Sequence, residues 1–130
     1  MKNKIEMLEK GLSACSTTTV TAANTAVAMG SGDMEVFATP AMVELMENAA
    51  MRAVAAVLPE GSTTVGSEMN TTHIKPSGLG AGITATAVLT EVEGRKLTFT
   101  VGARDAEGMI GEGVHVRYVV DRAKFLSKVR

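Results

Sequence analysis

One segment of the chain has the hydrophobic periodicity of a long helix. Between residues 37 and 58, apolar side chains recur at steps of three and four, which is typical of a helix with one broad buried face. These positions are Met42, Leu45, Met46, Ala49, Ala50, Ala53, Val54 and Val57. Thr39 is predicted as the N-cap and Pro40 as the first helical residue, because a threonine hydroxyl accepts from free amides and proline has no N–H to satisfy there. Pro59 and Gly61 are predicted to stop the helix.

Glu47 interrupts the division of this helix into apolar and polar sides. On a helical wheel it lies at the edge of the apolar stripe, near Val54 and Leu58, and away from the polar side that holds Asn48. A partly desolvated carboxylate in such a position is a candidate functional group. The alternative is a glutamate whose stem covers apolar surface while its head reaches water, and the helix alone favours that alternative.

The remaining pattern predicts strands and turns. A polar, mildly helical lead-in over residues 1–11 precedes a Thr-, Val- and Ala-rich strand over residues 13–25. Gly30 and Gly32 then predict a loop with a short extended piece over residues 26–38. Four further strands are predicted over residues 63–75, 82–93, 96–105 and 109–120.

Side-chain alternation assigns faces to two of these strands. One face of the 63–75 strand carries Val65, Ser67, Met69, Thr71 and His73, and the inner face of the 96–105 strand carries Leu97, Phe99, Val101 and Ala103. Glu93-Gly94 predicts a two-residue hairpin turn, and residues 106–108 predict the next turn. Asp121 is predicted to cap a short terminal helix with Phe125 and Val129 on one side.

The order of elements is a strand, a long helix, four strands in antiparallel succession and a helical tail. One helix against a mostly antiparallel sheet is an α+β arrangement. Because the helix is apolar around more than half of its circumference, the sheet is expected to curl around it, which is the hotdog fold. At 130 residues the chain is predicted to form a single domain over residues 1–130.

Composition and charge limit the classes of partner that the chain is expected to bind. The net charge of −1, an aromatic content of 3% and the absence of tryptophan all argue against a nucleic-acid partner. No apolar run is long enough to span a membrane, and Glu6, Glu9 and Lys10 interrupt any export signal around the LSAC motif. The single Cys15 cannot close an intrachain disulfide. We therefore expect a cytoplasmic protein with no membrane partner.

Three stretches resemble a known family. FATPAMVELMENAA, VGSEMNTTHIKPSGLGAG and GEGVHVRYVVDRAKF are similar to the corresponding segments of hotdog-fold acyl-CoA thioesterases of the fluoroacetyl-CoA thioesterase type, and the resemblance runs from about Gly11 to the C-terminus. It implies that Thr39, Glu47 and His73 form the catalytic set and that Gly66 and Arg117 contact substrate. It also implies an acyl-CoA site between two subunits of a homodimer, with a tetramer left open.

The stretch before Thr39 departs from the family pattern. Members selective for the fluorinated substrate place phenylalanines there as an apolar lid, whereas this chain has only Phe37, with Gly30, Gly32 and Asp33 nearby. The reaction class is therefore expected to be retained more firmly than selectivity for fluoroacetyl-CoA.

Thioester hydrolysis needs an activated oxygen nucleophile, a proton-transfer group and donors for the developing oxyanion. Thr39, Glu47 and His73 are suitable residue types, although a helix cap is an alternative role for Thr39 and a buried structural position is an alternative for His73. Eight residues of helix rise about 12 Å, so Thr39 and Glu47 of one chain cannot touch. Either the groups surround the substrate from different sides or two chains contribute them, and the family favours the second. The amides of Ala41 and Met42 are candidate oxyanion donors.

The other candidate residues favour simpler interpretations. His115 alternates with Arg117 on a strand and is expected to be structural. Gly78, Gly80 and Gly82 lack the spacing and the following helix of a phosphate-binding loop, and are expected to form a turn. No cluster has metal-ligand spacing, so we predict no metal, and no cofactor besides the CoA of the substrate.

Two other functions remain open at this point. A hotdog enoyl-CoA hydratase pairs a histidine with a nearby acid, but no Asp or Glu lies within five residues after His73. A non-catalytic acyl-CoA-binding protein would bind without releasing thiol. The acyl group, the choice between an acyl-enzyme and direct water attack, and the pathway are not determined by the sequence.

Overall fold

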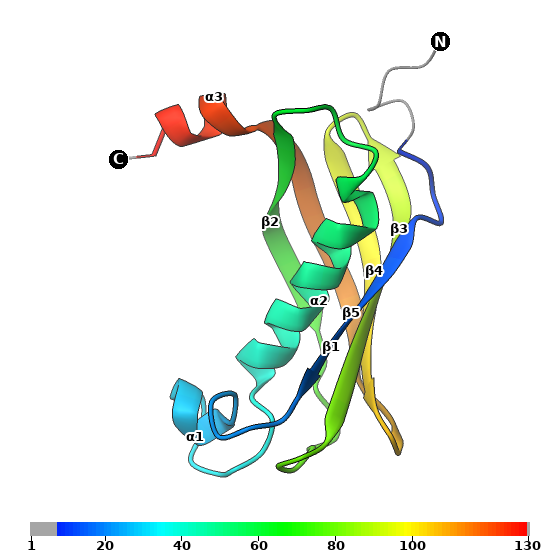
Figure 1. The fold of residues 1–130 in the computed structure, drawn as a ribbon. Coiled ribbons are helices and arrows are strands. Elements are labelled where there is room, and N and C mark those ends of the chain that lie inside the picture. Colours follow the sequence, from blue (N-terminus) through cyan, green and yellow to red (C-terminus); the bar gives the residue numbers. More distant parts are fainter. Residues whose placement is uncertain (1–7, 130) are drawn as a thin grey trace.

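The computed structural model describes residues 8–129 (Figure 1). The elements are β1 (Ser13–Thr19), α1 (Ala26–Met29), α2 (Thr39–Ala55), β2 (Ser62–Thr71), β3 (Gly82–Glu93), β4 (Lys96–Asp105), β5 (Gly108–Asp121) and α3 (Arg122–Ser127). Most of the predicted helical lead-in, residues 1–7, lies outside the described residues, and residues 8–11 are coil and turn. None of the described helices is long and apolar enough to cross a membrane.

The five strands form one antiparallel sheet in the order β1-β3-β4-β5-β2. The predicted simple succession of four strands is therefore wrong at one step, because β2 pairs with β5 at the sheet edge and not with β3. The ten residues between β2 and β3, which include Pro76 and Gly80, are long enough to cross the sheet end. This crossing segment carries His73.

The core lies between α2 and the concave face of the curved sheet, as Figure 1 shows. α2 contributes buried Ala41, Met42, Met46, Ala49, Ala50 and Val54. The sheet contributes, among others, Ile83, Ala85, Ala87 and Leu89 from β3 and Leu97, Phe99, Val101 and Ala103 from β4. The predicted inner face of the 96–105 strand is thus confirmed. Packing of this helix face against alternating strand residues fixes where both ends of α2 lie.

The ends of α2 differ from the predicted ones. Ala38 is the N-cap, in extended geometry and without a side-chain cap, so Thr39 and Pro40 are the first two helical residues. The prediction of Thr39 as the cap is wrong by one residue. The helix also ends at Ala55, before Pro59 and Gly61. The Thr39 hydroxyl is consequently not occupied by the amides of its own helix.

The segments before α2 also differ. β1 ends at Thr19, and the chain turns where the sequence pattern predicts a strand to residue 25. The short helix α1 was not predicted, and it forms because Thr25 caps it by accepting from the Ala28 N–H while Gly30 ends it at φ 75°. Bridges at Thr25–Phe37 and Val36–Gly78 hold the base of this segment.

A β-bulge in β2 overturns the predicted single face of that strand. The register shifts between Gly66 and Glu68, so Thr64 is the buried residue before the bulge, whereas Met69 lies against the core after it. β2 also ends at Thr71, which leaves His73 outside the strand.

The C-terminal half follows its predictions closely. β3 and β4 have the predicted bounds, but Glu93 is paired to Lys96, so the two turn residues are Gly94, at φ 61°, and Arg95, and the predicted Glu93-Gly94 turn is wrong by one residue. The Asp121 side chain caps α3 by accepting from the Lys124 N–H at 3.0 Å.

Candidate active site

Thr39 and His73 lie in direct contact. Thr39 Oγ1 and His73 Nδ1 are 2.7 Å apart, although 34 residues separate them in the chain. Thr39 is at the exposed start of α2, and His73 follows the end of β2. A hydroxyl that touches an imidazole nitrogen is the arrangement in which the ring can accept the hydroxyl proton.

The surroundings of His73 keep its ring neutral. Burial lowers the pKa of His73 below 6.5, and the backbone of Lys75 raises it in part. The buried Phe37 ring packs edge-on against the imidazole, with centroids 6.5 Å apart. His73 Nε2 is buried and has no hydrogen-bond partner among residues 8–129. One nitrogen thus meets Thr39, and the other is left unsatisfied.

The Thr39–His73 pair opens into a cavity that we call the hydroxyl–imidazole pocket. Its volume is about 260 Å³. It is lined by Ala26, Ser31, Val36, Phe37, Thr39, His73, Ile74, Lys75 and Pro76. The lining comes from the α1 segment, the start of α2 and the β2–β3 crossing segment. No carboxylate belongs to this set of lining residues.

Glu47 lies in a different cavity, which we call the carboxylate–arginine pocket. This cavity has a volume of about 420 Å³ and lies between α2, β2 and β5. It is lined by Glu44, Glu47, Asn48, Met51, Thr64, Val65, Gly66 and Arg117. Of the five predicted catalytic and substrate-contact residues, the structure therefore brings together Thr39 with His73, and separately Glu47 with Gly66 and Arg117.

Gly66 is the point on which the second group converges. A Cβ added there would lie 2.8 Å from Glu47 Oε1, 3.2 Å from the His115 ring and 3.3 Å from Arg117 Nη1. Only a residue without a side chain leaves room for the carboxylate, the imidazole and the guanidinium to approach one another.

Arg117 is held by a buried hydrogen-bond network. Its Nε donates to Thr64 Oγ1 at 2.8 Å, and its Nη2 donates to the Thr64 carbonyl at 2.9 Å. His115 Nδ1 lies 2.7 Å from the carbonyl oxygen of Glu68, so it carries the proton and donates, which leaves Nε2 to accept from Arg117 Nη1 at 3.2 Å. Burial is the main cause that lowers the pKa of His115 below 6.5, and Arg117 adds to it.

His115 is thus fully buried, in agreement with its predicted structural role. The part played by Thr64 has no signal in the sequence, because side-chain alternation does not reveal the β-bulge that decides which residues of β2 are buried.

The helix amides offer one of the two predicted oxyanion donors. The Met42 N–H, the other candidate donor, already donates to the Ala38 carbonyl at 3.0 Å in the first turn of α2, which makes it the weaker candidate. Pro40 has no N–H, and the Ala41 N–H makes no hydrogen bond within the described part of the chain. Ala41 therefore remains the candidate donor, at the positive end of the helix dipole.

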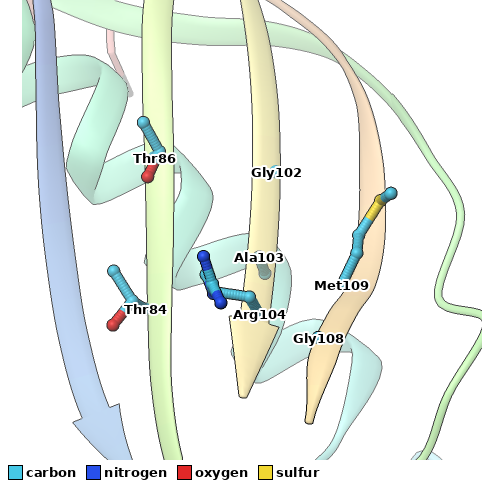
Figure 2. Close-up of a pocket in the computed structure, with 7 residues that line it drawn as sticks. All are labelled: Thr84, Thr86, Gly102, Ala103, Arg104, Gly108 and Met109. Carbon is cyan, nitrogen blue, oxygen red and sulfur yellow. The ribbon is translucent and has the colours of Figure 1, made fainter. Parts of the chain in front are cut away.

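A further hollow of about 320 Å³ lies on the side of the sheet that faces away from α2 (Figure 2). It is lined by Thr84, Thr86, Gly102, Ala103, Arg104, Gly108 and Met109. Its described lining contains no carboxylate or imidazole, and none of the predicted site residues. We therefore take the two pockets next to α2 as the candidate site. Within residues 8–129, no three His, Cys, Asp or Glu side chains are grouped as metal ligands.

Comparison with known proteins identifies the family. The model of the fluoroacetyl-CoA-specific thioesterase family matches residues 20–123. The chain belongs to this family. It is 45% identical over 96 residues to the fluoroacetyl-CoA thioesterase of Streptantibioticus cattleyicolor, covering 74% of this chain and 69% of that protein. The predicted family and thioesterase class are confirmed. The predicted hotdog fold is confirmed by similarity to the crystal structure of a hot-dog-like protein from Thermanaerovibrio acidaminovorans, at 25% identity and a TM-score of 0.87, over 98% of this chain and 95% of that one.

Solved structures agree with this assignment. The chain is similar to a phenylalanine-to-alanine mutant of the fluoroacetyl-CoA-specific thioesterase in complex with fluoroacetate and CoA, at 35% identity and a TM-score of 0.85, over 91% of this chain and 99% of that one. It is also similar to a hypothetical protein of Thermus thermophilus described as a thioesterase superfamily member, at 27% identity and a TM-score of 0.85, over 92% of this chain and 88% of that one.

Proposed function

We propose that this thioesterase hydrolyses a small acyl-CoA thioester at a site that two copies of the chain complete together. In this arrangement one copy supplies Thr39 and His73, and the other supplies Glu47, Gly66 and Arg117. The observation that carries the proposal is the separation of the predicted residues into two pockets of one chain, together with the buried His73 Nε2 that lacks a partner.

The unsatisfied nitrogen supports the need for a second group. If Thr39 donates its proton to His73 Nδ1, then Nε2 carries a hydrogen, and a buried donor without an acceptor costs about 1–3 kcal/mol. A carboxylate supplied by a second copy would accept that hydrogen and stabilise the imidazolium as it forms. Glu47 is the predicted carboxylate, and within one chain it lies in the other pocket.

The position of β2 supports pairing of two copies. β2 is an edge strand, so the side of its backbone opposite β5 is unpaired in the sheet. Such an edge can extend into a second copy through backbone hydrogen bonds. β2 also supplies Thr64, Val65 and Gly66 to the carboxylate–arginine pocket. A homodimer formed along this edge would bring a second chain next to that pocket.

The chemistry follows from the properties of each group. A neutral His73 accepts a proton from Thr39, or from a water in its place, and the resulting oxygen nucleophile attacks the thioester carbonyl. The developing oxyanion accepts from the free Ala41 N–H, and the C–S bond breaks as the protonated His73 returns its proton to the leaving CoA sulfur. On the Thr39 route a water, deprotonated by the same imidazole, then hydrolyses the acyl-threonine ester and releases the free acid. The Arg117 guanidinium would contact the acyl group or CoA. The relative whose structure holds fluoroacetate and CoA supports a small acyl group and CoA as the two parts of the substrate.

Complementation between two inactive variants tests the shared site. A Thr39→Ala chain and a Glu47→Ala chain, expressed together, would form mixed dimers with one intact site out of two. If the chains pair at random, about half of the dimers are mixed, so the preparation should recover about a quarter of wild-type activity. A matched pair, Thr39→Ala with His73→Ala, should remain inactive because both changes fall in the same half. Thiol release from short acyl-CoAs is the measurement. No recovery in the first pair would contradict a site built from two copies.

Mass spectrometry during turnover separates the two routes of attack. A transient mass increase equal to the acyl group, lost in Thr39→Ala, would indicate an acyl-enzyme. Release of free CoA also distinguishes hydrolysis from hydration of an enoyl-CoA and from binding without turnover.

A further inference from the structure

Outside the two pockets, the described chain contains one buried carboxylate in contact with the segment that carries His73. Asp105 is 7% exposed and ends β4, and Ser77 is 3% exposed and lies in the crossing segment between β2 and β3. Asp105 Oδ2 accepts from the Ser77 hydroxyl at 2.8 Å. These residues are 28 positions apart, so the bond ties the crossing segment to a different part of the sheet.

The carboxylate of Asp105 is itself held firmly. Its Oδ1 accepts from the Glu107 N–H at 2.9 Å, so the turn between β4 and β5 orients it. Lys75 Nζ lies 3.7 Å from the same oxygen. The hydrogen bond from Ser77, followed by that from the Glu107 backbone, lowers the pKa of Asp105 below 3.8. Asp105 is therefore an ionised acceptor throughout the neutral range, in which it can hold the Ser77 hydroxyl at one position.

Ser77 connects this carboxylate to the residues before Thr39. Its carbonyl accepts from the Phe37 N–H at 2.8 Å, and the neighbouring Val36 and Gly78 form a β-bridge. Ser77 thus bonds through its side chain to Asp105 and through its backbone to the strand-like segment that leads into α2. A shift of Ser77 would move Phe37, and with it the start of the helix.

The His73 side of the Thr39–His73 pair is fixed through β5. The Thr72 N–H donates to the Glu112 carbonyl at 3.0 Å, and the Ile74 N–H donates to the Ile110 carbonyl at 2.7 Å. His73 is therefore held at both of its chain neighbours by β5. Its distance to Thr39 then depends on how the Phe37 side is held, and Ser77 provides that connection.

We propose that Asp105 is a positioning residue for the Thr39–His73 pair, acting through Ser77 to fix the start of α2 relative to the imidazole. This inference rests on the proposed function for its effect on turnover, although the alignment of the two side chains can be measured separately. Asp105 lines neither of the two pockets, so any effect on the pair must pass through the residues that it contacts, and Ser77→Ala tests the Ser77 route separately from Lys75. Misplacement of a reacting group by about 1 Å can lower a rate by about 100-fold.

Two variants test this connection, each against a matched control. Asp105→Asn weakens the acceptor, and Ser77→Ala removes the hydroxyl while leaving the Asp105 bond to Glu107 intact. The control is Asp121→Asn, which also changes a carboxylate that accepts a backbone N–H, but at the cap of α3. We expect kcat to fall about tenfold in both test variants with KM changed less than about twofold, because substrate contacts remain while the reacting groups are misaligned. The control should keep wild-type kcat.

A double-mutant cycle separates this connection from general loosening. If both residues act through one hydrogen bond, the double variant should lose no more kcat than the more affected single variant. Losses that multiply, or a kcat that stays at the wild-type value in Ser77→Ala, would overturn the proposal.

The two histidines of the chain provide a readout that does not need activity. An NMR pH titration of their ring signals should show the His73 pKa rising toward 6.5 in both test variants, because a loosened segment admits water, while the His115 pKa stays unchanged. An unchanged His73, or an equal movement of both histidines, would contradict a local positioning role. Absence of thioesterase activity in the wild type would count against the proposed function alone, since the titration still decides the role of Asp105.

Discussion

The hydroxyl–imidazole pocket and the carboxylate–arginine pocket are built in opposite ways. In the first, Thr39 is exposed and His73 has a buried nitrogen with no partner among the described residues. In the second, Arg117 and His115 are buried, and their polar atoms bond to Thr64, to the Glu68 carbonyl and to each other. In the first pocket a buried ring nitrogen lacks a hydrogen-bond partner, whereas beside the second pocket the hydrogen-bond network is satisfied and lies next to a carboxylate.

This contrast separates the roles that the two pockets play in the fold. A satisfied buried network contributes to stability, and the loss of one member leaves the others unpaired. A pair at a helix start and a crossing segment, with one atom unsatisfied, contributes little to stability and is instead available to a substrate or a second chain. We therefore expect changes in the first pocket to affect turnover and changes in the second to affect both turnover and folding.

The largest expected effect is the loss of the base. His73→Ala should reduce kcat by about 10²–10⁴-fold, because it removes the group that accepts the Thr39 or water proton. Thiol release measures the rate, and chemical denaturation should show a stability change of less than about 1 kcal/mol, typical of a site away from the packed core. A folded variant with an unchanged rate would remove His73 from the mechanism.

Arg117→Ala tests the expected contribution of the carboxylate–arginine pocket to folding stability. The change leaves Thr64 and His115 Nε2 without their donor, so the free energy of unfolding should fall by about 2–3 kcal/mol. Urea denaturation measures the difference. Thr39→Ala serves as the control from the first pocket, and an equal loss of stability in both variants would show that the two pockets do not differ in this respect.

Gly66→Ala perturbs the second pocket without removing a functional group. The new Cβ would lie 2.8 Å from Glu47 Oε1, so the carboxylate must move, and kcat/KM should fall about tenfold. Gly102→Ala is a matched control, since its nearest described neighbour beyond the adjoining residues would be 3.8 Å away. Similar rates for the two alanine variants would mean that the position of Glu47 does not limit turnover.

The acid side of the pH profile should report His73. Its pKa is lowered below 6.5 by burial, and the base must be neutral, so kcat/KM should rise with pH with a midpoint below 6.5. The midpoint of this rise should persist in His115→Gln, because His115 bonds to the Glu68 carbonyl and to Arg117 and makes no contact with Thr39. If the midpoint disappeared in His115→Gln, the pH profile would report His115 and not His73.

The smallest effect concerns stability against pH. Both histidines have lowered pKa values in the folded chain, so below about pH 6.5 the unfolded chain binds more protons than the folded one. The contribution of the histidines to the free energy of unfolding is therefore complete above pH 6.5 and decreases as the pH falls. The contribution of Asp105 to the same free energy is lost only below pH 3.8. Urea denaturation at several pH values measures this, and a stability that rises on acidification from pH 7 to 5 would contradict it.

The parts of the fold that local patterns determine were predicted well. The β3–β4 hairpin has its predicted bounds because alternation and Gly94 both act within a few residues. The body of α2 follows its apolar stripe for the same reason. The errors arise where distant residues decide. The Thr39 hydroxyl bonds to His73 and does not cap its helix, and the bulge in β2 faces His115, which lies 47 residues beyond Glu68.

The candidate site shows the same division. Thr39, Glu47 and His73 were named through family resemblance, and helix geometry alone predicted that Thr39 and Glu47 of one chain do not touch. The connection from Asp105 to Ser77 has no local signal, because a single acid after a strand and a serine in a turn are common in any sequence. Only the folded chain places them together.

The α1 segment has a practical consequence for redesign of substrate preference. Its base is fastened by the Thr25–Phe37 and Val36–Gly78 bridges, whereas Val27, Met29 and Met34 project outward with 42–66% of their surface exposed. These exposed residues of the α1 segment can be substituted without disturbing the core beneath them. Libraries that diversify those three residues should therefore keep the folded yield constant, whereas changes at Ala26 and Ser31, which line the hydroxyl–imidazole pocket, would act on the site itself.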